Sequence, residues 1–400
     1  VKNILILGGG SIGLFSAYYL RKSGFEVTVI DRYDYTNGCS FGNAGLIVPS
    51  HIVPMASPGY VKSGFKMMFD PGAPLSVKMP PSLDLLKWLT LFYFAASHKH
   101  VNQSIPVLKE ICLFSQALLK DIHHSGEIDF KLHEKGWFML YKTRKMEHEE
   151  AEMAKRANEC GIKAEILTAD EVRKMEKNIS EQVLGGVYYP GDNHLDAEEL
   201  MHSMVSYLRK AGVKLIENTN VAEIKRNGKI CTELVTDKGN YRFDDLVVAA
   251  GTWSAELLKT LGVSLSLQPG KGYSFKRPTT KSITYPALLA EARIAVSPIS
   301  ESCVRFTSGM DLGYFNSEIS NARLAGIENA IAGYYISGKD EKYDVGSVWQ
   351  GHRPCSFDGL PYIGTASGFK NVYIATGHSM LGITLGPATG KLISELISGE

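Results

Sequence analysis

Three glycines and one acidic residue near the N-terminus have the spacing of a dinucleotide-binding site. The apolar run Ile4–Leu7 leads into Gly8-x-Gly10-x-x-Gly13, and Asp31 follows the next apolar strand. In such a unit Gly8 allows a tight turn, Gly10 lets the backbone approach a pyrophosphate, and Gly13 lets helix and strand pack closely. The pyrophosphate would lie at the helix N-terminus, and Asp31 would accept hydrogen bonds from a ribose. The motif alone leaves open whether the dinucleotide carries a flavin or a nicotinamide.

Two further segments combine small and polar residues in a way that suits a bound cofactor. Asn37–Gly45 follows the first unit, and its Ser40 and Asn43 offer hydrogen bonds to a flat or phosphorylated ligand. Val247–Trp253 is an apolar strand whose last residues are too small to crowd such a ligand. Taken alone, the first segment also fits a flexible loop, and the second fits ordinary packing of a strand against a helix.

An arginine near the C-terminus indicates recognition of a carboxylate. Arg353 lies in the turn Gly351-His-Arg-Pro354, which presents its side chain stiffly, and a planar guanidinium pairs well with a carboxylate. The glycine-rich loop Gly377–Thr384 then leads toward the last helix. Its N–H groups are suited to stabilise negative charge that develops on a reduced cofactor.

The elements that position these residues have α/β character at both ends of the chain and in its middle. A strand–helix–strand unit spans residues 1–40, residues 83–125 have a helical pattern, and a terminal helix is expected from about Pro387 to Ile397. Short strands dominate residues 264–345. The pattern predicts two discontinuous domains: a dinucleotide-binding domain of residues 1–60, 194–263 and 346–400, and a substrate domain of residues 61–193 and 264–345.

Composition and charge exclude several classes of protein. The chain of 400 residues has a formal net charge of +1 and no basic stripe, which argues against nucleic acid as a partner. Its six cysteines include no CxxC pair, so neither a zinc site nor a disulfide framework is indicated, and a reducing, cytoplasmic location fits. The first strand begins so early that no signal peptide is expected, and no apolar run reaches the roughly 18 residues of a membrane span.

Two segments allow more than one interpretation. Residues 83–96 are rich in aromatic side chains and are expected to form a helix that packs on the domain; the alternative is a helix lying in a membrane interface. Residues 192–196 hold two aspartates and a histidine, but their spacing fits a turn and a helix cap better than a metal site.

Together these motifs resemble those of the FAD-dependent D-amino acid oxidase superfamily, and within it the bacterial branch of D-amino acid and D-hydroxyproline dehydrogenases. The resemblance runs from end to end of the chain. It is carried by the glycine fingerprint with Asp31, Ser40–Gly45, Ala249–Trp253, Lys271–Tyr273, Trp349–Pro354, Asp358–Pro361 and Gly377-His378. It implies FAD as cofactor, a Rossmann-like α/β domain that binds it, and a discontinuous β-rich substrate domain.

The resemblance also implies roles for individual residues. Arg353 corresponds to the family's arginine that binds the substrate carboxylate, and His51, Tyr273 and His378 are the other candidate catalytic residues of the pocket. A structural hydrogen bond is the alternative for His51, and simple packing is the alternative for Tyr273. The cofactor-binding residues implied are Gly8, Gly10, Ser11, Ile12, Gly13, Asp31, Arg32, Ser40, Asn43, Ala44, Gly45, Leu46, Val221, Ala250, Gly251, Trp253, Gly351, Gly377, His378, Met380, Leu381, Gly382 and Thr384.

The function implied is oxidation of a small D-amino or imino acid, such as D-alanine, D-proline or D-hydroxyproline, in amino-acid catabolism. Arg353 would hold the carboxylate so that the Cα–H faces the flavin for hydride transfer, with no dedicated general base. Electrons would pass to a quinone or respiratory acceptor, with residues 83–96 as a peripheral contact on the inner face of the cytoplasmic membrane. Three alternatives stay open: an O₂-using oxidase of the glycine or sarcosine type, a nicotinamide-dependent dehydrogenase, and a flavin-binding protein without enzymatic activity.

Overall fold

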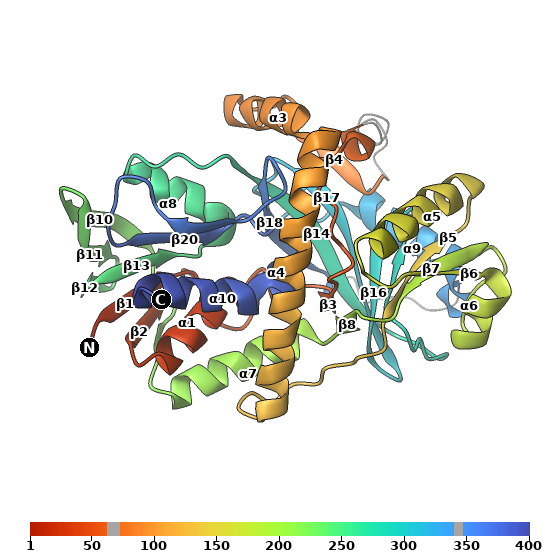
Figure 1. The fold of residues 1–400 in the computed structure, drawn as a ribbon, viewed down its shortest axis with the longest axis horizontal. Coiled ribbons are helices and arrows are strands. Elements are labelled where there is room, and N and C mark those ends of the chain that lie inside the picture. Colours follow the sequence, from red (N-terminus) through yellow and green to blue (C-terminus); the bar gives the residue numbers. More distant parts are fainter. Residues whose placement is uncertain (62–72, 340–346) are drawn as a thin grey trace.

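The computed structural model describes residues 1–61, 73–339 and 347–400, and two large sheets organise this part of the chain (Figure 1). The first sheet has the strand order β19 (Tyr362–Thr365), β20 (Val372–Thr376), β13 (Asp245–Val248), β1 (Asn3–Leu7), β2 (Glu26–Ile30) and β9 (Lys214–Ile216). Its strands are parallel, except that β19 runs antiparallel to β20. Helix α1 (Ser11–Lys22) connects β1 to β2, so the strand–helix–strand unit predicted for residues 1–40 is confirmed.

Both faces of this sheet are covered, because alternate residues of β1 point to opposite sides. Ile4 and Ile6 pack on one face with α1, α7 (Ala197–Lys210) and α10 (Gly382–Ser398). Leu5 and Leu7 pack on the other face with α8 (Ser254–Thr260) and with a small antiparallel sheet. That small sheet consists of β10 (Val221–Asn227), β11 (Ile230–Thr236) and β12 (Gly239–Arg242).

The second large sheet is mostly antiparallel. Its strand order is β18 (Trp349–Ser356), β14 (Leu267–Pro278), β17 (Cys303–Leu312), β16 (Ile294–Ser300), β15 (Ala287–Leu289), β5 (Trp137–Tyr141), β7 (Gly185–Tyr189) and β6 (Glu165–Thr168), and β4 (Leu75–Val77) pairs with β17. Helices α6 (Ala169–Met175) and α9 (Asn321–Tyr334) pack against one face of it. A short pair, β3 (Leu46–Ile47) with β8 (Asn193–His194), lies apart from both large sheets.

Helix α4 (His98–Ser125) links the two halves of the molecule and runs across its middle in Figure 1. Its residues Leu119 and Ile122 belong to the core of the first sheet. Its residues Val101 and Ile105 belong to a core that includes β5 and α5 (Arg144–Glu159) of the second half. The described residues also form α3 (Leu83–Ala95), the helical residues 58–61, and two short 3₁₀ turns, Gly251–Trp253 and Ile336–Lys339.

One expectation about the second half of the chain is incomplete and another is wrong. Strands dominate the described part of residues 264–345 as expected, but this part also contains the helix α9, whose buried Leu324, Ile327 and Ile331 recur at helical spacing. The last helix begins at Gly382 instead of near Pro387, so the end of the expected loop Gly377–Thr384 is the first turn of α10.

The predicted division into domains stays a prediction. Its border at residues 345 and 346 lies outside the described residues. One strand departs from it, because β18, assigned to the dinucleotide-binding domain, pairs with β14 in the second sheet.

Candidate active site

A cavity of about 1810 Å³ lies between the two large sheets and is lined by segments from both halves of the described chain. Pockets for drug-sized ligands have volumes of roughly 300–1,000 Å³. The cavity is therefore large enough for a dinucleotide cofactor together with a small substrate.

The glycine fingerprint forms one end of this cavity. Gly8 has a φ of +108°, and a Cβ there would lie 2.4 Å from the Ala249 carbonyl oxygen, so only glycine fits where β1 passes β13. Gly10 is the N-cap of α1 and provides no side-chain cap, and the N-terminus of α10 also has no side-chain cap. Residues of the first turns of both helices line the cavity. Two helix N-termini therefore face the same space, which favours negatively charged groups there.

Asp31 lies at the end of β2 on the wall of the cavity. One carboxylate oxygen accepts a hydrogen bond from the Gly9 amide at 2.6 Å, and the other accepts one from the Tyr33 amide at 2.8 Å. Burial raises the pKa of this carboxyl group, and the two backbone hydrogen bonds oppose that rise. Each oxygen keeps a second lone pair, so the group can still accept hydrogen bonds from a ribose.

Most of the predicted cofactor-binding residues line the cavity. They are Gly8, Gly10, Ser11, Ile12, Asp31, Arg32, Ser40, Asn43, Ala44, Leu46, Val221, Ala250, Gly251, Trp253, Gly351, His378, Met380, Leu381, Gly382 and Thr384.

Three predicted glycines shape the backbone behind the cavity and do not line it. A Cβ on Gly13 would lie 1.8 Å from the Gly8 carbonyl oxygen, which agrees with a role in helix–strand packing. A Cβ on Gly45 would lie 1.9 Å from the Leu195 carbonyl oxygen, and Gly377 has a φ of +84°.

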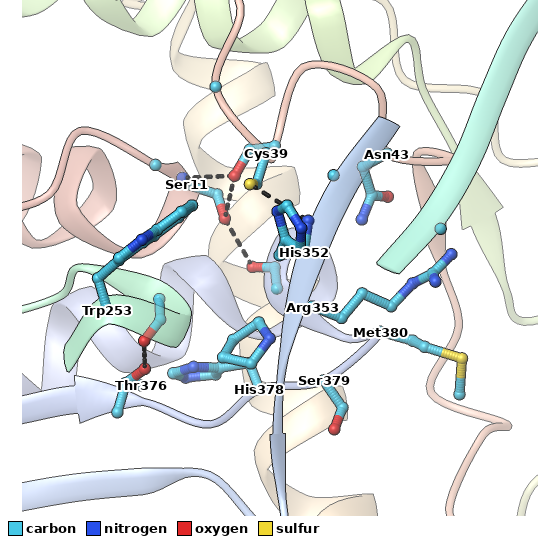
Figure 2. Close-up of a pocket in the computed structure, with 18 of the residues that line it drawn as sticks. Ser11, Cys39, Asn43, Trp253, His352, Arg353, Thr376, His378, Ser379 and Met380 are labelled. Carbon is cyan, nitrogen blue, oxygen red and sulfur yellow. Dashed lines mark hydrogen bonds between the residues drawn. The ribbon is translucent and has the colours of Figure 1, made fainter. Parts of the chain in front are cut away.

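Several polar side chains around the cavity suit a polar cofactor. Buried atoms of Gln350, His352, His378 and Ser379 have no hydrogen-bond partner among the residues that the structure describes. All four residues line the cavity, and Figure 2 shows three of them with Trp253 and Arg353 around the same space. Buried polar groups are normally paired, so these atoms fit a ligand that supplies the partners. Among them, the His378 Nε2 atom already pairs with the Thr389 hydroxyl at 2.9 Å, which leaves its Nδ1 atom.

Trp349 provides a flat wall because two glycines make room for its indole. A Cβ on Gly42 would lie 2.2 Å from this ring, and a Cβ on Gly351 would lie 2.1 Å from it. All three residues line the cavity. Any larger residue at either position would overlap the Trp349 ring, so both positions require glycine.

At the other end of the cavity, Arg353 reaches across the second sheet from β18. Its guanidinium lies over Gly272 of β14, where a Cβ would be 2.2 Å from the Nη1 atom. The same nitrogen donates a hydrogen bond to the Gly309 carbonyl of β17 at 2.6 Å. The pairing of β14 with β17 shifts register at this point, because Lys271 faces Asp311 while Tyr273 faces Ser308. Strand β17 therefore has one extra residue here, and the Gly309 carbonyl is free to accept a hydrogen bond from Arg353.

The Arg353 guanidinium has unused capacity for hydrogen bonding. It forms no ion pair with a carboxylate in residues 1–61, 73–339 or 347–400. Burial lowers its pKa, yet a guanidinium stays charged at any pH a protein survives. A half-buried cation with several free N–H donors is suited to bind a carboxylate from the cavity.

The other predicted catalytic residues differ in where they lie. His51 and His378 line the cavity, and burial lowers the pKa of His51 to about 4 and that of His378 to about 3. Both imidazoles are therefore neutral at neutral pH. Tyr273 does not line the cavity. Successive residues of a strand point to opposite faces, and Tyr273 points away from Arg353 into the core beneath α9, where its hydroxyl donates to Asp311 at 2.8 Å.

Sequence reasoning missed several cavity residues, among them Tyr60, Trp137 and Arg293. None of them belongs to a recognisable motif. Only the pairing of distant strands brings β5 and the start of β16 to this wall, so the sequence carried no local signal for them.

The aromatic segment of residues 83–96 forms α3, and this helix has two different faces. The Trp88 indole is buried and donates to the Cys355 carbonyl at 3.0 Å, and Phe92 and Tyr93 line the cavity. Leu83 and Phe94, in contrast, are 84% and 74% exposed. Among the described helices, none combines the length and the apolar composition that crossing a bilayer requires.

The acidic segment of residues 192–196 serves structural roles. Asp196 caps α7 by accepting from the Glu198 amide at 3.0 Å, as predicted. Asp192 accepts hydrogen bonds from the hydroxyl and the amide of Ser50. In the described part of the chain, no three His, Cys, Asp or Glu side chains are arranged to hold a metal ion.

Comparison with known proteins agrees with this geometry. Residues 3–396 match the family described as FAD dependent oxidoreductase (DAO). The chain is 30% identical over 399 residues to a D-amino acid dehydrogenase of Helicobacter pylori, covering 99% of this chain and 94% of the relative. It is 31% identical over 407 residues to the enzyme of the same name from Vibrio vulnificus, covering 99% and 96%. The fold is similar to that of glycine oxidase from Geobacillus kaustophilus, with a TM-score of 0.80, 22% identity, and coverage of 100% and 96%.

Proposed function

Since the chain belongs to the family of FAD-dependent oxidoreductases, we propose that it oxidises a small D-amino or imino acid to the 2-imino acid, with substrates resembling D-alanine, D-proline or D-hydroxyproline. The relatives named D-amino acid dehydrogenase, which align over nearly the whole chain, support this substrate class. When FAD is bound, it supplies the hydride acceptor for the oxidation. The product is an imine that water hydrolyses.

The observation that carries the proposal is Arg353. Its guanidinium is held by the Gly309 carbonyl, has free donors, and faces a cavity that extends to the glycine fingerprint. A substrate carboxylate paired with Arg353 is held at a fixed position, so that the remaining barrier falls mainly through orientation of the Cα–H bond. The N–H groups at the N-terminus of α10 favour negative charge on the cofactor side of the same space.

No side chain is assigned the role of general base. His51 and His378 are neutral at neutral pH because burial lowers their pKa values to about 4 and about 3, and Arg353 is a permanent cation. Imidazoles with such low pKa values hold a proton only weakly and are poor acceptors for the proton of a substrate ammonium group, so the substrate is expected to react with its amine already deprotonated. The role of the protein is to bind the carboxylate, orient the Cα–H bond and exclude water.

The electrons pass to a quinone or another respiratory acceptor, and α3 provides the contact with the membrane. This helix joins the cavity to the surface, because Phe92 and Tyr93 line the cavity while Leu83 and Phe94 are exposed. The protein then works on the cytoplasmic side of the membrane as a peripheral protein. Cosedimentation with anionic lipid vesicles tests this contact. Replacing Leu83 and Phe94 by Glu is expected to abolish binding, and unchanged binding would contradict it.

An O₂-using amine oxidase is the second candidate, and the similarity of the fold to glycine oxidase favours it. The two candidates differ only in the electron acceptor. Release of hydrogen peroxide at the rate of substrate consumption would identify an oxidase.

The proposed function is tested by mixing the FAD-loaded protein with D- and L-amino and imino acids, in air and without air, and with or without an artificial dye acceptor. Anaerobic bleaching of the flavin by D-alanine or D-proline, followed by dye reduction, is the expected result. Bleaching by L-enantiomers alone, or by no amino or imino acid, would overturn the proposal.

A further inference from the structure

A second arginine, Arg293, lies on the wall of the same cavity. It occupies the turn between β15 and β16 with a φ of +51°, a backbone conformation that non-glycine residues rarely adopt. Residues held in such conformations are often found at functional sites. Its guanidinium carbon lies 5.6 Å from the centre of the Tyr60 ring, which also lines the cavity.

Two neighbouring residues of β17 contact the Arg293 backbone and the Arg353 guanidinium. The Ser308 hydroxyl donates to the Arg293 carbonyl at 3.3 Å, and the Gly309 carbonyl accepts from the Arg353 guanidinium at 2.6 Å. Strands β16 and β17 are paired, with Ala295 opposite Thr307. Adjacent strands are about 4.8 Å apart, so Arg293 starts only one strand away from the carbonyl that holds Arg353. Because both arginines also line the same cavity, a molecule bound to Arg353 through one end can direct its other end toward Arg293.

Nothing in the described protein neutralises Arg293 directly. It forms no ion pair with a carboxylate in residues 1–61, 73–339 or 347–400. Its positive charge changes the pKa values of two buried groups. It contributes to the lowered pKa of His51 and opposes the raised pKa of Glu150. Burial nevertheless raises the pKa of Glu150 to about 7, so this carboxyl group is only partly ionised at neutral pH.

We propose that Arg293 binds a second carboxylate on the substrate, which makes the preferred substrate a D-amino acid with an acidic side chain. This inference rests on the proposed function, in which Arg353 holds the α-carboxylate, and it changes the preferred side chain from the uncharged ones of D-alanine and D-proline, which then react more slowly, to an acidic one. Neighbouring residues of β17 hold the Arg293 backbone and the Arg353 guanidinium, both arginines line one cavity, and neither has an ion-pair partner among the described residues, so the pair can match two carboxylates on one molecule. A carboxylate is the group that a planar guanidinium binds best, through two parallel hydrogen bonds.

The first test compares D-glutamate with D-glutamine, which have nearly the same size and differ in side-chain charge. The ratio of their kcat/KM values is measured for the FAD-loaded wild type and for Arg293→Met, Arg293→Lys and Arg242→Met. The wild type is expected to prefer D-glutamate at least tenfold, Arg293→Met to lose that preference, and Arg293→Lys to keep part of it. Arg242 is 91% exposed on β12 and serves as the control whose ratio does not change.

The second test measures binding without turnover. Isothermal titration of the FAD-loaded protein compares glutarate with pentanoate, which have equal chain length and differ by one carboxylate. Glutarate is expected to bind the wild type at least tenfold more tightly, and Arg293→Met is expected to remove the difference. Equal affinities in the wild type, or a difference that survives in Arg293→Met, would overturn the inference.

The two proposals fail in different ways. If the wild type oxidises D-alanine but shows no preference for D-glutamate over D-glutamine, the role of Arg293 is wrong and the proposed function stands. If no D-amino or imino acid is oxidised, the proposed function is wrong, and glutarate binding still decides whether Arg293 recognises a second carboxylate.

Discussion

Replacing Arg353 by Ala tests the proposed function most directly. The side chain supplies the charged donors for the substrate carboxylate, and no carboxylate of the described protein competes for them. Truncating one partner of a buried, hydrogen-bonded charge pair costs 2–5 kcal/mol or more; the half-buried position of Arg353 sets the range here at about 2–4 kcal/mol. Since about 1.4 kcal/mol corresponds to a factor of ten, kcat/KM should fall by roughly 30- to 800-fold.

The assay is anaerobic dye reduction by the FAD-loaded protein, with flavin content measured from its visible absorbance. Arg353→Ala should keep its flavin, because Arg353 lies beyond Gly272 at the substrate end of the cavity. Arg353→Lys keeps the charge but loses the two-pronged geometry, so its kcat/KM should lie between those of the wild type and the alanine variant. A fully flavinylated Arg353→Ala protein with kcat/KM within about threefold of wild type would refute the assignment.

Three further predictions follow from the positions of other residues. Gly10→Val should give a folded but colourless protein, because a Cβ at Gly10 meets only the Ser40 hydroxyl, at 3.3 Å, and otherwise extends into the cavity. Circular dichroism measures the folding of the variant, and visible absorbance measures its flavin content. A yellow protein would contradict the prediction. Tyr273→Phe should lower the free energy of unfolding by about 1 kcal/mol in a urea titration, because it removes the hydrogen bond to Asp311. A fall in kcat/KM greater than about threefold would show instead that the hydroxyl contributes to the reaction. With rising pH, kcat/KM should increase in a single step, at the pKa of the substrate amine, because His51 takes up a proton only below its lowered pKa of about 4. A second step between about pH 5 and 8 that is absent in His51→Asn would show that His51 titrates in that range and would contradict the prediction.

The cofactor end of the site could be predicted from the sequence because its constraints are local. Gly8 and Gly10 lie in the turn between β1 and α1, and Gly13 lies in the first turn of α1. A Cβ on Gly8 or Gly13 would overlap backbone atoms, and Gly10 leaves room for the close approach of a ligand. The strand–helix–strand unit expected over residues 1–40 is present as β1, α1 and β2. Local spacing was sufficient there, since helix period, turn and strand follow one another without interruption.

The substrate end could not be predicted in the same way, because it depends on which face of a strand points to the cavity. Tyr273 belongs to a motif that the resemblance singled out, yet its neighbour Gly272 is the residue under the Arg353 guanidinium. Helix α9 covers the side of the sheet that holds Tyr273, so the residues on the opposite side of the strand face the cavity, and this helix was not predicted. Arg293 was missed for a related reason: only the pairing of β16 with β17 brings it close to the carbonyl that holds Arg353.

The Tyr273 ring packs against the backbone that holds Arg353. A Cβ on Gly309 would lie 2.9 Å from the Tyr273 ring, and Gly309 has a φ of +87°, so ring and backbone are packed closely at the extra residue of β17. The Gly309 carbonyl holds the Arg353 guanidinium from this position. The aromatic ring therefore supports the orientation of Arg353 from the opposite face of the sheet, and phenylalanine provides the same support. The role of Tyr273 in the reaction stays a prediction, and in the structure its ring packs behind Gly309 while its hydroxyl donates to Asp311.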